Sequence, residues 1–267
     1  MICFDHVSFK YPSGSSLVDI SFTVQSGEFV ALLGENGAGK STLCRLCNGL
    51  LKPSAGNVWI DNKNTKETKT STLAQHIGYL FQNPDRQICH NTVAEELLFG
   101  LNFVGFSPRE AQERCKEMLE LFSLNGSRDP FNMSRGERQQ VALASVLARK
   151  PQVLILDEPT TGLDYRECVH IMDILLPLHR AGTTIFMISH DMELVNDYAE
   201  RVLLLSCGAL IGDGPTHALM KNKALLDQAS LLPAQIPALA LRLGSDFDHV
   251  CSVDGMIDTI GKKKGLV

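Results

Sequence analysis

The chain has 267 residues, of which 44% are hydrophobic, which suits one large globular domain or a domain with an appendage. Its formal net charge of -5 argues against a general nucleic-acid surface, which normally carries a basic stripe. No run reaches the roughly 18 apolar residues that cross a bilayer, and the first residues alternate like a strand, not like a signal peptide. We therefore expect a cytosolic chain without a nucleic-acid partner, and any membrane role to be peripheral.

The first predicted buried strand, residues 29–33, is a short continuous apolar run that leads into a phosphate-binding loop. Glycines there let backbone N–H groups curl around phosphates, and the following helix adds its positive dipole end. Lys40 would supply charge to the β- and γ-phosphates of ATP, and Ser41 would bind Mg²⁺ through its hydroxyl. The residues of this loop predicted to bind nucleotide are Gly34, Asn36, Gly37, Ala38, Gly39, Lys40, Ser41 and Thr42.

Two of the eight cysteines, Cys44 and Cys47, form a C-x-x-C in the helix expected after this loop. No second pair or histidine cluster accompanies them, and a cytosolic chain keeps its thiols reduced. Their spacing of about one helical turn favours helix packing over metal or redox chemistry.

Residues 85–150 are predicted to be helical, with one helix beginning at Ser107 and Pro108. Just before this region, Gln82 follows a short apolar segment, and its amide could reach Mg²⁺ or an attacking water. Taken alone, Gln82 would be an ordinary surface glutamine.

A second buried strand, 153–156, ends at Asp157 and Glu158. Asp157 suits a direct or indirect Mg²⁺ ligand, and Glu158 can act as the general base on water. The plainer alternative for Glu158 is a solvated carboxylate at a strand end. A third strand, 184–188, leads to His190, which could donate to a γ-phosphate oxygen or could be an ordinary loop histidine.

The three strand ends are expected to meet, because ligands in open α/β sheets bind outside the carboxyl ends of the strands. This convergence is stronger evidence for a site than any one motif. From about Leu225 the composition changes again and ends in the basic residues 262–264, which predicts a small C-terminal extension.

The ordered set Tyr11, 34–42, Gln82, 133–137, 157–158, 162–164 and His190 resembles the ABC ATPase cassette over about residues 1–220. The resemblance implies an α/β fold: a RecA-like P-loop NTPase core, an antiparallel β subdomain and an inserted helical subdomain at about 85–150. The nucleotide-binding domain would span 1–224, and 225–267 would form a helical extension. By the same resemblance, Tyr11 stacks on adenine and Asp164 lies at a dimer seam.

The signature segment departs from the family's usual Leu-Ser-Gly-Gly-Gln, which contacts the γ-phosphate held by the other subunit. Ser134 and Gly136 are kept, whereas Arg135 and Glu137 replace the other polar positions. Physically, Ser134 and Glu137 form a capping-box pattern that opens a helix through Ala148. We expect the two new charges to offset in part at the phosphate; a purely structural cap is the alternative.

Residues 81–87 and 92–100 more narrowly resemble the A components of energy-coupling factor importers of vitamins or cobalt. That implies docking of the helix after Gln82 on a transmembrane T component, at the cytoplasmic face of the membrane. Glu95 and Glu96 would offer anionic contacts there, with Leu97, Leu98 and Phe99 as apolar anchors. An ordinary helix packed inside the subdomain is the alternative. A separate S component would bind the cargo.

The predicted function is ATP binding and hydrolysis with Mg²⁺, driving a head-to-tail homodimer or heterodimer of cassettes to close. Three alternatives remain at this point: the ATPase of another ABC transporter type, a soluble ABC ATPase acting on DNA or ribosomes, and an ATP-binding module without hydrolysis. The usual second cassette or long coiled-coil insertion of the soluble enzymes is not visible, and the set Asp157, Glu158 and His190 speaks against the module.

Overall fold

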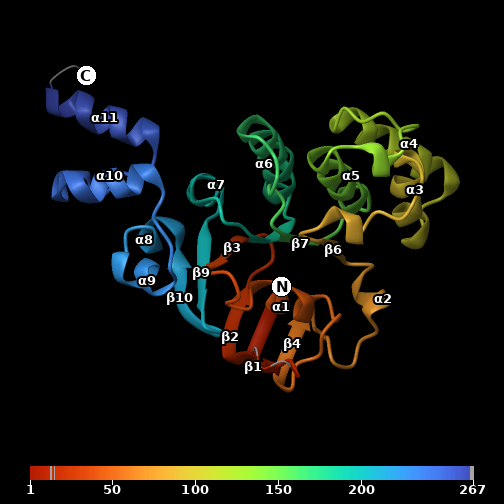
Figure 1. Cartoon of the computed structure of the whole chain (residues 1–267), viewed down its shortest axis with the longest axis horizontal. Coiled ribbons are helices and arrows are strands. Elements are labelled where there is room, and N and C mark those ends of the chain that lie inside the picture. Colours follow the sequence, from red (N-terminus) through yellow and green to blue (C-terminus); the bar gives the residue numbers. More distant parts are fainter. Residues whose placement is uncertain (13, 15, 265–267) are drawn as a thin grey trace.

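The computed structural model describes residues 1–12, 14 and 16–264, and its centre is a mixed sheet of six strands (Figure 1). In spatial order the strands are β10 (Ala209–Pro215), β9 (Arg201–Ser206), β3 (Phe29–Gly34), β8 (Thr184–Ile188), β7 (Val153–Asp157) and β6 (Ile77–Leu80). The five strands from β9 to β6 run parallel, and β10 pairs antiparallel with β9 at one edge. The three buried strands predicted from the sequence are confirmed as β3, β7 and β8.

A second sheet is antiparallel and built mostly from the N-terminal part of the chain. Its strands in spatial order are β2 (Ser16–Val24), β1 (Ile2–Lys10), β4 (Ala55–Ile60) and β5 (Lys63–Asn64). Together the two sheets and the helices form the α/β P-loop fold that the sequence predicts.

The helices cover both faces of the central sheet. In chain order the α-helices are α1 (Lys40–Cys47), α2 (Thr70–Leu73), α3 (Val93–Phe103), α4 (Pro108–Leu121), α5 (Arg135–Ala148), α6 (Tyr165–Arg180), α7 (Met192–Tyr198), α8 (Thr216–Leu219), α9 (Lys223–Gln228), α10 (Gln235–Leu243) and α11 (Val253–Lys264). Short 3-10 helices occupy η1 (Pro84–Arg86), η2 (Pro130–Asn132) and η3 (Ser245–Phe247). Within the described residues, none of these helices combines the length and apolarity that a membrane span requires.

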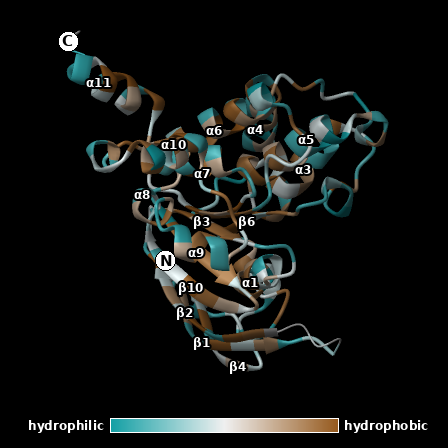
Figure 2. Ribbon diagram, turned by 60° about the vertical axis from the view of Figure 1, so that its left-hand side comes forward, coloured by the Kyte–Doolittle hydropathy of each residue, from teal (hydrophilic) through white to brown (hydrophobic). Residues whose placement is uncertain are grey.

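Strand β3 divides two hydrophobic clusters, because successive side chains of a strand point to opposite faces. Phe29, Ala31 and Leu33 pack with α3 to α8, whereas Val30 and Leu32 pack with α1 and the antiparallel sheet. Both faces are therefore dry, which explains the continuous apolar sequence of the strand. Figure 2 shows this hydrophobic layer between more polar helices. Cys44 and Cys47 lie fully buried on α1, as their spacing predicts.

Three helices of the inserted segment begin with the same reciprocal cap. Thr92, Ser107 and Ser134 each accept the backbone N–H three residues on, and the glutamate at that position accepts the N–H of the cap. Such a box satisfies two otherwise unpaired donors at a helix start. The helix starts expected at Ser107 and Ser134 are thus confirmed.

The C-terminal part has two sections. Helix α9 packs on the core, since Leu226 is buried and Ser206 Oγ donates to the carbonyl of Gln228 at 3.1 Å. Helices α10 and α11 instead project from the body (Figure 1) around a small cluster of their own, which includes Phe247. A separate extension would therefore begin after Leu231, whose side chain still packs on the main core, and not at residue 225.

Candidate active site

The loop between β3 and α1 has a backbone that only glycine accommodates at two positions. Gly34 has a φ of 151°, and a Cβ there would lie 2.1 Å from the carbonyl oxygen of Leu205. Gly39 precedes α1 with a φ of 106°. The loop curls around Lys40, whose Nζ donates to the carbonyls of Gly34 at 2.7 Å and Glu35 at 2.9 Å. Burial lowers the pKa of Lys40, against the opposing effect of Glu158 and Asp157.

A pocket of about 310 Å³ opens over this loop. It is lined by Tyr11, Leu17, Asn36, Gly37, Gly39, Lys40, Ser41, Thr42, Gln82 and Glu158. Thr42 Oγ1 donates to the Tyr11 hydroxyl at 3.3 Å, and the ring of Phe9 packs edge-on against that of Tyr11. Tyr11 therefore presents a fixed aromatic ring beside a phosphate-sized loop. Two loop residues predicted to bind nucleotide do not line this pocket: Ala38 is buried within the loop, and Gly34 is the buried last residue of β3.

Ser41 and Asp157 meet at the floor of the site. Ser41 Oγ donates to Asp157 Oδ1 at 3.1 Å, across the end of β7. Burial raises the pKa of Asp157 even though this hydrogen bond lowers it. A buried carboxylate beside a hydroxyl is the kind of oxygen pair that Mg²⁺ prefers, and a dication there would offset the cost of the buried charge. These residues fit the ion.

Glu158 is held from several sides. Its backbone lies in the left-handed region with a φ of 55°, which is strained for a residue other than glycine and common at functional sites. Thr161 Oγ1 donates to Oε2 at 2.8 Å, and His190 Nε2 lies 2.9 Å from Oε1. Burial raises the pKa of Glu158, but hydrogen bonds from Thr161 and Gln82 and the His190 ring outweigh it, so the pKa is lowered overall.

His190 reaches the pocket through Glu158. Its own side chain lines a second hollow of about 490 Å³ with Thr160, Thr161 and Asp191 among others, on the far side of that carboxylate. Asp191 caps α7 by accepting the backbone N–H groups of Glu193 and Leu194. The ends of β7 and β8 thus bring Glu158 and His190 together beside the P-loop, in keeping with the expected convergence.

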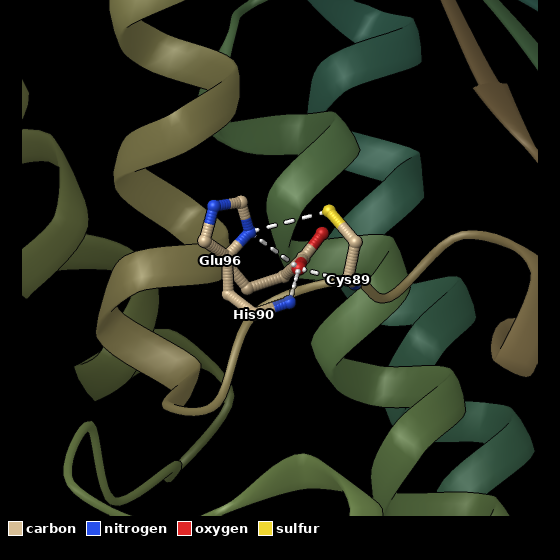
Figure 3. A group of neighbouring side chains, drawn as sticks. All are labelled: Cys89, His90 and Glu96. Carbon is tan, nitrogen blue, oxygen red and sulfur yellow. Dashed lines mark hydrogen bonds and ion pairs between the residues drawn. The ribbon is translucent and has the colours of Figure 1, made fainter.

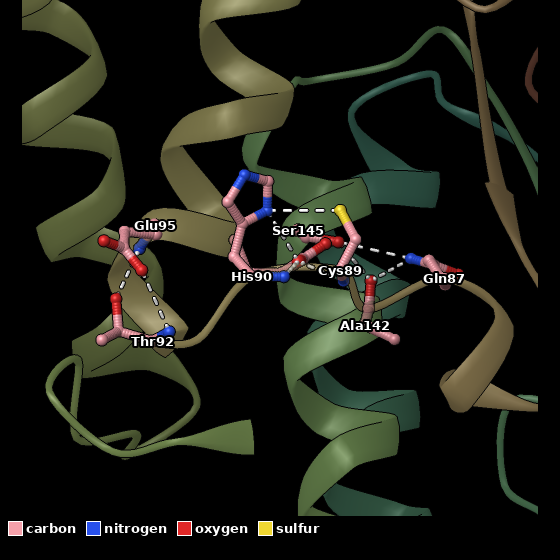
Figure 4. Close-up of polar contacts among 8 residues, drawn as sticks. Gln87, Cys89, His90, Thr92, Glu95, Ala142 and Ser145 are labelled. Carbon is pink, nitrogen blue, oxygen red and sulfur yellow. Dashed lines mark hydrogen bonds and ion pairs between the residues drawn. The ribbon is translucent and has the colours of Figure 1, made fainter. Parts of the chain in front are cut away.

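The loop that carries Gln82 is anchored to α5 just beyond that residue. Asp85 pairs with Arg138 at 2.7 Å. Gln87 Nε2 donates to the carbonyl of Ala142 at 2.8 Å (Figure 4). Gln82 is exposed and lines the same pocket as Lys40 and Glu158. A displacement of α5 would therefore also displace the loop that carries Gln82.

The signature residues lie elsewhere. Ser134, Gly136 and Asp164 do not line the pocket over the P-loop; Ser134 and Asp164 are exposed caps of α5 and α6. The carboxylate of Glu137 accepts hydrogen bonds from Arg128 and from the backbone N–H of Ser134. These bonds, above all the one from Arg128, lower the pKa of Glu137 to about 2. Its charge is therefore already paired.

One predicted docking residue faces inward. Glu96 is only 4% exposed and accepts the backbone N–H groups of Cys89 at 2.9 Å and His90 at 3.1 Å. The prediction that it offers an anionic surface contact is wrong, and Leu97 is buried as well. Glu95 is exposed, with its carboxylate accepting the N–H of Thr92, and Phe99 is 56% exposed.

The sequence analysis did not assign a role in the site to three residues that support it: Thr161, Gln87 and Arg138. Thr161 follows Glu158 by three residues in a loop, and no motif marks it as a donor. Gln87 and Arg138 join the loop that carries Gln82 to α5, and only the packing of that helix shows these contacts.

The family model described as ABC transporter matches residues 17–161, more than half of the chain. The chain belongs to the ABC transporter family. The family predicted from the sequence is therefore confirmed.

Named relatives agree with this assignment. A putative ABC transporter ATP-binding protein of Methanosarcina mazei is 43% identical over 98% of this chain, which spans 44% of that relative. The first curated relatives are all matched over less than half of their length. The energy-coupling factor transporter ATP-binding protein EcfA of Methanothermobacter thermautotrophicus is 42% identical over 86% of this chain and 76% of its own.

A solved structure also superposes on most of the chain. It is an ATP-binding cassette in a dimeric, post-hydrolysis state bound to ADP and Pi, with a TM-score of 0.74 and 29% identity. The match covers 81% of this chain and 99% of the other.

Proposed function

We propose that this ABC cassette hydrolyses ATP to power an importer of the energy-coupling factor type, for vitamins or transition-metal ions. The observation that carries the proposal is that Lys40, Ser41 and Glu158 line one pocket of about 310 Å³ at the edge of the central sheet, with Asp157 hydrogen-bonded to Ser41 beside it. The loop supplies phosphate contacts, and the carboxylates supply a metal ligand and a base.

Glu158 is the general base in this proposal. Because its pKa is lowered, the carboxylate is ionised at neutral pH and can accept a proton from an attacking water. Thr161 and His190 occupy its two oxygens at 2.8 and 2.9 Å and so fix its orientation. Exchange of one of these contacts for the water would be part of reaching the reactive state.

Ser41, Asp157 and Gln82 are the residues that would hold Mg²⁺. When bound with ATP, the ion supplies charge that neutralises the β- and γ-phosphates. Lys40 adds a fixed positive charge, and Tyr11 offers its ring to the adenine. The helix dipole of α1 acts in the same direction.

A second cassette completes the site in this proposal. Ser134 and Gly136 lie outside the pocket of their own chain, and Ser134 is exposed at the start of a 14-residue helix. In a head-to-tail dimer that helix start would meet the γ-phosphate held by the partner. The likeness to a dimeric cassette with ADP and Pi supports this arrangement.

An apolar groove between the core and the helical subdomain suits a membrane partner. It has a volume of about 370 Å³, and its apolar lining includes Leu50, Tyr79, Phe81, Phe99, Phe103 and Val146. Leu50, Phe99 and Phe103 are 49, 56 and 47% exposed. We assign the groove to a transmembrane T component, with a cargo-binding S component contacted indirectly. The chain would then work at the cytoplasmic face of the membrane.

Phosphate release tests the core of the proposal. Glu158→Gln should cut ATP turnover roughly 10²- to 10⁴-fold while the protein still binds ATP, because the amide cannot take a proton. It should also accumulate as an ATP-bound dimer in size-exclusion chromatography with light scattering. Glu113→Gln, which alters an exposed ion pair on α4, should leave turnover unchanged. Near-normal hydrolysis by Glu158→Gln removes Glu158 from this role.

A further inference from the structure

Three side chains of different chemistry converge where the chain enters α3, away from the P-loop. They are Cys89, His90 and Glu96, whose ligand atoms all lie within 4.8 Å of one another (Figure 3). Cys89 is exposed, His90 is partly exposed and Glu96 is buried. Nothing in the nucleotide chemistry uses them.

Their spacing is close to that of metal ligands. Cys89 Sγ lies 3.3 Å from His90 Nδ1, and His90 Nδ1 lies 3.2 Å from Glu96 Oε2. Bond lengths of about 2.3 Å to sulfur and 2.0–2.2 Å to nitrogen or oxygen give ligand separations of roughly 3.3–3.6 Å around a tetrahedral Zn²⁺. Two edges of the required tetrahedron are thus nearly formed in the folded chain.

We propose that Cys89, His90 and Glu96 bind a divalent transition-metal ion of the Zn²⁺ class, with a fourth position open to solvent. A thiolate, an imidazole and a carboxylate together favour such an ion over Mg²⁺ or Ca²⁺, which take oxygen ligands. Three protein ligands with one open position are the pattern of accessible zinc sites.

Glu96 makes the site rigid. Its Oε2 accepts two backbone N–H groups from the residues that carry the other ligands, so all three side chains are held in one frame. Its side chain is 4% exposed, and its ion-pair partner among the described residues is His90. An ion would therefore meet a fixed negative charge with two more ligands at the surface.

Binding must displace the thiol proton. Burial and the nearby Glu96 carboxylate raise the pKa of Cys89, so the neutral thiol predominates at neutral pH without an ion. The metal takes the sulfur as thiolate and the proton leaves to buffer.

The site adjoins the apolar groove. The His90 ring centroid lies 4.8 Å from that of Phe99, and both Glu96 and Phe99 line the groove. An ion that fixes His90 would also hold this wall of the groove. The metal site itself does not depend on the proposed transport function.

Cobalt substitution gives the clearest test, because thiolate ligation to Co²⁺ produces a charge-transfer absorption that the oxygen ligands of the nucleotide site cannot. The full-length reduced protein, without nucleotide, should bind one Co²⁺ with that absorption and lose it when Zn²⁺ is added. Cys89→Ser and His90→Ala should each weaken Zn²⁺ binding by at least about tenfold, since even lost supporting contacts cost about 10–100-fold.

Cys207→Ser is the matched control. Cys207 is also exposed and donates to a carboxylate, that of Glu35, but no histidine joins them among the described residues. Its substitution should leave the cobalt spectrum and the zinc affinity unchanged. The proposal is overturned if the wild type shows no thiolate-to-cobalt band, or if Cys89→Ser and His90→Ala bind Zn²⁺ as tightly as the wild type. Then Glu96 serves only to tie the loop by hydrogen bonds.

Discussion

The burial of Asp157 places its carboxylate at the site but lowers the stability of the fold. Asp157 is 2% exposed at the end of β7, and its pKa is raised because burial disfavours the charged form. An acid whose folded pKa lies above its unfolded value destabilises the fold at pH values above the folded pKa. At low pH, where both states are protonated, this cost is absent.

Asp157→Asn should therefore stabilise the nucleotide-free protein at pH 7 while it removes Mg²⁺-dependent turnover. Ser41 can still donate to the amide oxygen, so the local hydrogen bond survives. Thermal unfolding should show a higher Tm, by roughly 2–4 °C for each kcal/mol relieved in a protein of this size. The gain should shrink toward pH 3.

Asp173→Asn provides the comparison, because Asp173 is an exposed residue of α6. It should change the Tm little at either pH. A lower Tm for Asp157→Asn at pH 7 would show that its charge is well compensated in the empty site.

At this scale the sequence predicted which polar residues belong together, because each follows a buried strand or a glycine-rich loop. It could not predict how they touch. The bond from Thr161 to Glu158 and the positive φ of Glu158 depend on how a short loop folds back. The pairing of His190 with Glu158 depends on the register between β7 and β8.

Helices α4 and α5 begin with the same cap, which separates the structural from the functional role of the signature. Ser107→Ala and Ser134→Ala each remove a side-chain acceptor at a helix start, and each should cost about 0.5–2 kcal/mol in the free energy of unfolding. Only Ser134→Ala should also reduce ATP-dependent dimerisation and turnover.

Chemical denaturation and phosphate release on the two variants provide the measurement. Equal losses of activity would mean that Ser134 acts only as a cap. A loss confined to Ser134→Ala supports a contact with the partner's nucleotide.

Among the elements, the sequence predicted the three buried strands and two helix starts, since continuous apolar runs and capping patterns are local signals. The sequence did not predict correctly which face of α3 is buried. Adjacent residues of a helix point about 100° apart, and here Glu95 is exposed whereas Glu96 is buried. Two adjacent glutamates do not reveal which one turns inward; the backbone donors of Cys89 and His90 decide it.

The molecule as a whole presents its apolar groove where the helical subdomain meets the core, and a charge there should break docking. Phe99→Asp should abolish co-purification of the cassette with a small integral-membrane T partner from detergent-solubilised membranes. Basal phosphate release by the isolated protein should persist, because Phe99 does not line the nucleotide pocket.

Leu121→Asp, which alters an exposed residue on α4 that does not line the groove, is the matched control and should retain the partner. Retention by Phe99→Asp would place the contact elsewhere. Recovery of ribosomes or DNA in place of a membrane protein would contradict the importer assignment.

The two anchors on α5 set how far Gln82 can travel. Only four residues, 81–84, lie between the end of β6 at Leu80 and Asp85, which forms the ion pair with Arg138. Four extended residues span at most about 14 Å. Because this segment is so short, a small displacement of α5 would move Gln82 as well. A longer loop could change its own conformation and leave Gln82 in place.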